Sequence, residues 1–164
     1  MKIRLTSVYD YPHHEFVELL RGTESFRFIT WPILSFQPAS GIWPERWEIG
    51  RDVFRFRLFG ILPVGSQQIS ISNPSNGFAS DGSVVLRDDG SGTLMQRWDH
   101  WITTKSLGDN QTLYVDEVEV HARYLPLVFT PFCALFALAF YAHRQRRWKK
   151  YLLHKKHPQC NAGS

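Results

Sequence analysis

The sequence has 164 residues, of which 43% are hydrophobic and 15% aromatic, and its formal net charge is +4. A chain of this length can form a single domain that buries about two-thirds of the surface exposed by the unfolded chain. It therefore needs neither a disulfide nor a structural metal, and Cys133 and Cys160 have no spacing typical of either.

The positive charge is confined to the C-terminal end. Residues 141–164 contain seven Lys or Arg and no acid, whereas residues 1–140 contain twelve bases and fifteen acids. Nucleic-acid sites spread Lys and Arg over a folded face, so the mildly acidic body argues against nucleic-acid binding. The first residues alternate in polarity and lack the apolar core of a secretion signal, which predicts a cytoplasmic protein.

The N-terminal part predicts a strand followed by one or two short helices. Residues Lys2–Tyr9 alternate between polar and apolar in the manner of a half-buried strand. Pro12 suits a first helical turn, and the apolar positions 16, 19 and 20 share one helical face before Gly22. From residue 23 to residue 50, prolines and Gly41 interrupt longer elements. We expect a brief strand at Ile33–Phe36 there, with the tryptophans packed on a sheet.

A regular succession of strands and turns begins after residue 50. The predicted strands are Val53–Phe59, Gln67–Ser72, Ser83–Arg87, Leu94–Thr104 and Thr112–Ala122. The connections are rich in Gly, Pro, Asn and Asp, which tight turns favour, and comprise Pro63–Gly65, Asn73–Gly82, Asp88–Gly92 and Gly108–Asn110. Because short turns join antiparallel neighbours, the five strands are expected to form a meander.

The last element is a long helix. An apolar run of eighteen residues, Leu125–Ala142, continues with helical spacing through Trp148, Tyr151 and Leu152. It predicts one helix that begins near Pro126 and has about 28 residues, or roughly 40 Å. Two interpretations stay open, because the run could cover the apolar face of the sheet or anchor the chain in a membrane, where about 20 apolar residues are usual. Candidate membrane contacts are the flanking basic residues Arg144, Arg146, Arg147, Lys149 and Lys150.

The segments Arg57–Gly65, Trp98–His100, Thr112–Val120 and Phe140–Trp148 resemble a bacterial branch of the START/Bet v 1-like superfamily, also named SRPBCC. The order of predicted elements is similar as well. The resemblance covers about residues 1–153 and implies an α+β helix-grip fold, in which a curved antiparallel sheet wraps around the long C-terminal helix. Residues 154–164 would form a basic, disordered tail. The resemblance also implies a cavity between sheet and helix that takes lipids, sterols or polyketide-like molecules.

Strand parity predicts which side chains face this cavity, because alternate residues of a strand share a face. The predicted lining residues are Phe54, Phe56, Leu58, Ile69, Ile71, Trp98, His100, Ile102, Tyr114, Asp116, Val118, Phe132, Leu135, Phe136 and Phe140. If the last turn centres on Gly108, His100 lies opposite Asp116, and a slip of two residues would keep the faces while changing the partners.

His100 and Asp116 allow two interpretations. They could form a closed hydrogen bond that only fixes the strands, or His100 could offer its second ring nitrogen to a ligand or act as a general base. The other histidines lack the spacing of a metal site, and no cofactor is predicted. The preferred hypothesis is non-catalytic binding or transport of a hydrophobic small molecule. One alternative is a cyclase, dehydratase or isomerase using His100 and Asp116, and the other is a peripheral or tail-anchored membrane protein.

Overall fold

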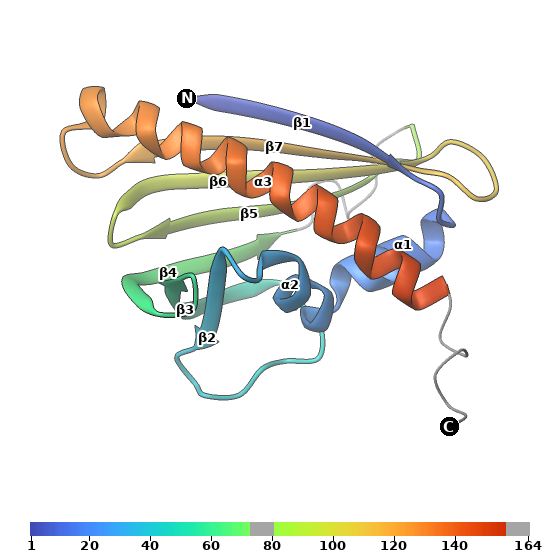
Figure 1. Ribbon diagram of the computed structural model, residues 1–164, viewed down its shortest axis with the longest axis horizontal. Coiled ribbons are helices and arrows are strands. Elements are labelled where there is room, and N and C mark those ends of the chain that lie inside the picture. Colours follow the sequence, from blue (N-terminus) through green and yellow to red (C-terminus); the bar gives the residue numbers. More distant parts are fainter. Residues whose placement is uncertain (73–80, 157–164) are drawn as a thin grey trace.

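The computed structural model describes residues 1–72 and 81–156 and contains one antiparallel sheet with a long helix across one face (Figure 1). In chain order the elements are β1 (Lys2–Tyr9), α1 (His13–Arg21), α2 (Thr23–Thr30), β2 (Leu34–Pro38), β3 (Gly50–Leu58), β4 (Leu62–Ser72), β5 (Val84–Gly92), β6 (Met95–Ser106), β7 (Thr112–Ala122) and α3 (Pro126–Lys156). The seven strands are ordered β1-β7-β6-β5-β4-β3-β2. The predicted helix-grip fold and its meander are confirmed.

Two predicted turns are wrong. The Asp88–Gly92 segment continues β5, and the chain reverses only at Thr93 and Leu94. Gly92 allows β5 and β4 to approach closely, since a Cβ atom on Gly92 would lie 2.6 Å from the Ser66 carbonyl oxygen. The Pro63–Gly65 segment likewise belongs to β4, and the preceding reversal uses the left-handed backbone of Phe59 and Gly60.

The ends of two other predicted segments also differ. Residues 23–30 form α2, which is the second of the one or two short helices expected after the first strand and shortens the irregular segment that was expected from residue 23 to residue 50. Helix α3 continues to Lys156 and thus includes the first three residues of the predicted tail. Residues 157–164 of that tail and residues 73–80 of the predicted Asn73–Gly82 connection lie outside the described residues.

The register between β6 and β7 is two residues from the one centred on Gly108. His100 lies opposite Val118, and Ile102 lies opposite Asp116. The cause is the loop, which spans residues 107–111 and is closed by a 3.0 Å hydrogen bond from the Leu107 N–H to the Gln111 carbonyl. Its centre is therefore Asp109. The inward and outward faces are unchanged, because a strand repeats every two residues.

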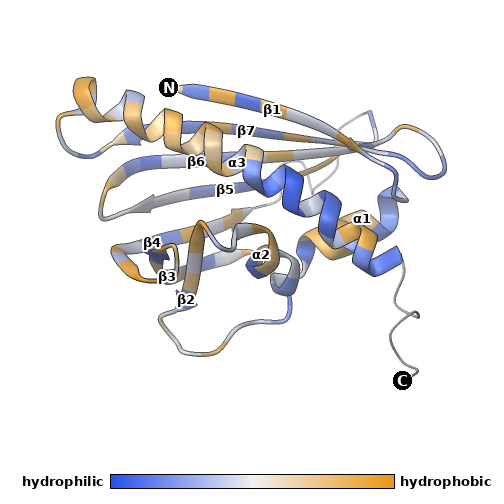
Figure 2. Cartoon of the chain, in the orientation of Figure 1, coloured by the Kyte–Doolittle hydropathy of each residue, from blue (hydrophilic) through white to orange (hydrophobic). Residues whose placement is uncertain are grey.

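The two halves of α3 differ in hydropathy and in burial. The N-terminal half is apolar and the C-terminal half is largely polar (Figure 2). Even so, the side chains of the apolar half are mostly exposed, with Leu127 at 94% and Phe132 at 66% of their full accessibility. The polar half enters the core, where Trp148 is fully buried and packs against Phe16. Contact with the sheet and α1, not hydropathy alone, decides which part of the helix is buried.

This arrangement corrects the basic membrane-contact set. Arg144 is only 4% exposed, so it does not lie on the surface. Arg147 is half-buried over the Phe28 ring and donates two hydrogen bonds to the Phe28 carbonyl. Arg146, Lys149 and Lys150 remain exposed. Within the part of the chain that is described, α3 is the one helix with the length and hydropathy of a membrane span, a property that core helices of soluble proteins share.

Candidate functional site

A cavity of about 400 Å³ lies between the sheet, α2 and α3, which is within the range of small-molecule sites. Ten of the predicted side chains line it: Phe56, Leu58, Ile69, Ile71, Trp98, His100, Ile102, Phe132, Phe136 and Phe140. The wall is therefore aromatic and aliphatic over most of its area. Whether these side chains contact a ligand stays a prediction.

The other five predicted side chains do not line the cavity. Phe54 is fully buried against Trp43 and Trp47. Leu135 is 65% exposed on another face of α3. The sequence could not show this, because an apolar run does not indicate which side of the helix meets the sheet. Tyr114, Asp116 and Val118 face the concave side of the sheet but are completely covered by α3 and its neighbours.

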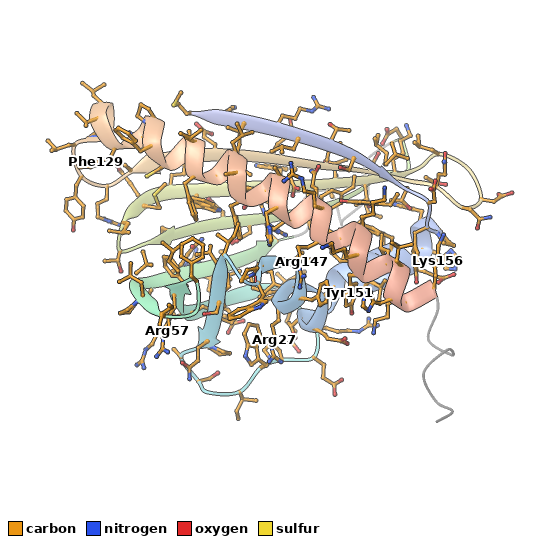
Figure 3. The ribbon with its side chains drawn as sticks, in the orientation of Figure 1. Arg27, Arg57, Phe129, Arg147, Tyr151 and Lys156 are labelled. Carbon is orange, nitrogen blue, oxygen red and sulfur yellow. The ribbon has the colours of Figure 1, made fainter. Side chains whose placement is uncertain are left out.

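A mouth of the cavity lies toward the N-terminal end of α3, and the exposed Ile49, in the loop before β3, lines the cavity as well. Phe129 marks this end, far along the helix from Tyr151 and Lys156 (Figure 3). Phe129 is 46% exposed and Phe132 is 66% exposed, yet both also line the cavity. An apolar molecule could therefore pass between solvent and cavity without crossing a polar barrier at this side of the rim.

His100 and Asp116 form the hydrogen-bonded pair that was predicted, although they are diagonal and not directly opposite across β6 and β7. The His100 Nε2 atom lies 2.7 Å from Asp116 Oδ1. The same oxygen accepts a hydrogen bond from the Tyr114 hydroxyl at 2.8 Å, and Oδ2 accepts one from Gln145 Nε2 at 2.9 Å. Asp116 therefore accepts three hydrogen bonds while fully buried.

The protonation of this pair follows from its surroundings. Burial disfavours the imidazolium and lowers the pKa of His100 despite the adjacent carboxylate. Burial alone would raise the pKa of Asp116, but the hydrogen bonds and charges around the carboxylate lower it below its ordinary value. Because an ionised carboxylate only accepts, Nε2 of the neutral His100 must carry the proton and donate it. The lone pair is then on Nδ1, and His100 lines the cavity.

Asp88 is a site residue that the sequence reasoning missed. It lies directly opposite His100 across β5 and β6, lines the cavity, and accepts a 2.8 Å hydrogen bond from the Ser70 N–H. Desolvation raises the pKa of this carboxyl to about 7. Its signal in the sequence was the alternation of Val84 and Leu86, which continues to Asp88 but was assigned to a turn.

Arg144 is the second missed residue. It lines the cavity between Phe140 and Trp148, which are one helical turn before and after it on the same face of α3. This spacing of four residues could have indicated that Arg144 faces the core, but Arg144 was grouped with the basic residues that follow it. In residues 1–72 and 81–156, no group of three His, Cys, Asp or Glu side chains is placed to hold a metal ion.

Several solved structures share this fold over nearly the whole chain. An aromatase/cyclase from a Streptomyces species is 10% identical, with a TM-score of 0.60, and 100% of this chain and 99% of that one are covered. Norcoclaurine synthase from Thalictrum flavum is 9% identical, with a TM-score of 0.63 and coverage of 94% and 87%. A START superfamily protein from Mycobacterium smegmatis is 12% identical, with a TM-score of 0.57 and coverage of 92% and 95%.

At such low identity these likenesses establish the fold alone, and it is the START/Bet v 1-like helix-grip fold. No curated protein matches the sequence. A family model described as "Domain of unknown function (DUF8410)" matches residues 31–152, which includes every side chain of the cavity wall from Leu34 to Trp148. The chain therefore belongs to the DUF8410 family.

Proposed function

We propose that this protein binds or carries a hydrophobic small molecule, such as a lipid, sterol or polyketide-like compound, in the cavity beneath α3. The observation that carries the proposal is the cavity of about 400 Å³ lined mainly by aromatic and aliphatic side chains. Apolar walls of this kind bind by shape and burial, with a few polar groups to orient the ligand.

Two positions on α3 provide a matched test. Cys133 is half-buried and lines the cavity, whereas Leu135 is 65% exposed and does not. Cys133→Trp should fill the cavity and weaken binding of Nile red by about tenfold or more, equal to about 1.4 kcal/mol. Leu135→Trp should leave binding unchanged. Equal probe binding by both variants and the wild type, with both folded by circular dichroism, would place the probe elsewhere and reject this cavity as the site.

A second candidate function is acid–base catalysis, as in a cyclase, dehydratase or isomerase. It is favoured by the position of His100 opposite Asp88, with Asp116 behind it. A neutral His100 would accept a proton from the α-carbon of the substrate at Nδ1. The Asp88 carboxyl, whose pKa is about 7, would donate a proton to the carbonyl oxygen. Together these groups would enolise a bound ketone.

Deuterium exchange at the α-carbon of a long-chain methyl ketone, followed by NMR in D₂O, measures this chemistry directly. The wild type should accelerate exchange, and His100→Gln should abolish the acceleration. His121→Gln, an exposed change on β7, should have no effect. Exchange no faster than in buffer alone would eliminate this candidate for ketone substrates.

Membrane contact is a further candidate role, and the expected cytoplasmic location also stays a prediction. The exposure of the apolar N-terminal half of α3 favours contact through that half. The exposed Arg146, Lys149 and Lys150 belong to the opposite end of the helix.

A further inference from the structure

Arg144 is an unusual wall residue for a cavity that is otherwise apolar. It is 4% exposed, lines the cavity, and comes from the half of α3 that packs into the core. Its guanidinium lies over the Tyr141 ring, 4.9 Å from the ring centroid, and 5.9 Å from that of Phe140. These contacts hold the cation among aromatic groups, away from bulk water.

The guanidinium lacks an acidic partner. Over residues 1–72 and 81–156, no carboxylate oxygen lies within 4.0 Å of it, and its Nε atom is buried without a hydrogen-bond acceptor. The Tyr141 hydroxyl interacts with it, but this neutral group carries no charge to balance the guanidinium, and it also accepts a 3.0 Å hydrogen bond from Trp98 Nε1. Asp116 is a nearby ionised group, but it accepts its hydrogen bonds from His100, Tyr114 and Gln145 and none from Arg144.

An arginine side chain stays protonated inside proteins and has five N–H donors. Burying such a charge without a directly bonded acceptor is strongly unfavourable. Elsewhere in this chain, arginines at the rim of the core have such acceptors, as Arg87 has in its two hydrogen bonds to Asp99 at 2.8 and 2.9 Å. The buried Nε–H of Arg144, which has no acceptor, is therefore best explained by an acceptor that arrives with the ligand.

We infer that the ligand is an amphipathic carboxylate whose head group pairs with Arg144 while its apolar tail fills the cavity toward the start of α3. The inference rests on the proposed binding function and specifies its ligand class. A planar carboxylate matches the fork of a guanidinium. A single charge suits the site better than a higher one, because ionised Asp116, and Asp88 when it is ionised, repel any anion near Arg144 and repel a more highly charged one more strongly.

The geometry of α3 also fits a chain-like molecule. Phe132, at the exposed rim, and Arg144 are twelve positions apart on one helix, which corresponds to about 18 Å at 1.5 Å per residue. Between them Phe136 and Phe140 repeat every fourth residue and line the cavity. The charged end would be deep in the protein and the tail would point to the mouth.

Displacement of Nile red by dodecanoate and by dodecanol tests the inference at matched chain length. The wild type should bind dodecanoate at least about tenfold more tightly than dodecanol, the ratio that corresponds to about 1.4 kcal/mol. Arg144→Met should lose this preference and keep its affinity for dodecanol. Arg144→Lys, which retains the charge, should keep part of the preference and serves if the Met variant does not fold. Arg146→Met, an exposed change on the same helix, should behave as the wild type.

The outcomes separate the two levels of the proposal. Equal affinities of the wild type for dodecanoate and dodecanol would overturn the role of Arg144 and leave the binding of apolar molecules intact. A preference for dodecanoate that survives in a folded Arg144→Met would also overturn it. If neither compound nor the dye binds, both the inference and the proposed function are rejected.

Discussion

Removal of the Asp116 carboxylate should be among the most damaging single changes to the stability of this protein. The side chain is completely buried and accepts hydrogen bonds from His100, Tyr114 and Gln145 at 2.7, 2.8 and 2.9 Å. In Asp116→Ala these three donors lose their acceptor. Each buried polar group left unpaired costs about 1–3 kcal/mol, and some can turn or recruit water. We therefore expect a loss of about 3–5 kcal/mol, as for other broken buried charge networks.

Thermal and urea unfolding measure this loss. For a domain of this size, about 2–4 °C of Tm per kcal/mol gives a decrease of roughly 6–20 °C. Glu117→Ala is the matched control, because Glu117 follows in the same strand, points outward, and makes only an exposed contact with Arg4 at 3.8 Å. It should change stability by less than about 0.5 kcal/mol. If Asp116→Ala is no more destabilising than Glu117→Ala, the reasoning about the buried network is wrong.

Three further predictions concern Asp88 and the two halves of α3. Because the folded pKa of Asp88 is raised to about 7 from 3.8, its contribution to stability is complete below pH 3.8 and is lost as pH rises through about 7. Asp88→Asn cannot ionise, so the Tm of the wild type should fall relative to that of the variant between about pH 4 and 7. Parallel Tm profiles of the two proteins over this range would contradict the raised pKa. Trp148→Ala should cost about 3–5 kcal/mol in urea unfolding, since this side chain is fully buried. Leu127→Ala should cost less than about 0.5 kcal/mol because Leu127 is 94% exposed. A similar loss of stability in Trp148→Ala and Leu127→Ala would show that the start of α3 is packed against other parts of the protein. If the exposed start of α3 contacts lipid, the wild type should float with anionic vesicles at low salt and Leu127→Asp should not, whereas a wild type that fails to float rejects the membrane role.

Strand faces could be predicted from the sequence because they depend only on a period of two. Trp98, His100 and Ile102 face inward as the alternation indicates. The register could not be predicted, since it depends on how many residues the loop after Ser106 uses, and Gly108 alone does not define the loop centre. The two-residue register error did not affect the predicted contact between His100 and Asp116, because side chains at diagonal positions on a sheet can still form a hydrogen bond.

The site was predicted less completely than the fold. Its apolar part follows from hydropathy and parity, but Asp88 and Arg144 are polar residues at positions facing the core, where composition suggests a turn or a surface. Only the tertiary contacts of α3 decide that its polar half is buried and its apolar half exposed. A sequence pattern describes a helix's faces, and it does not specify which portion of a long helix the sheet covers.

Isoleucine methyl NMR tests the central claim, binding inside the cavity, most directly. Ile69, Ile71 and Ile102 line the cavity, whereas Ile42 is 77% exposed in a loop and does not line it. Titration with dodecanoate should shift the three cavity methyl signals together and leave that of Ile42 unchanged. Shifts confined to Ile42 and other surface methyls, with the cavity signals unmoved, would show that dodecanoate binds outside the cavity.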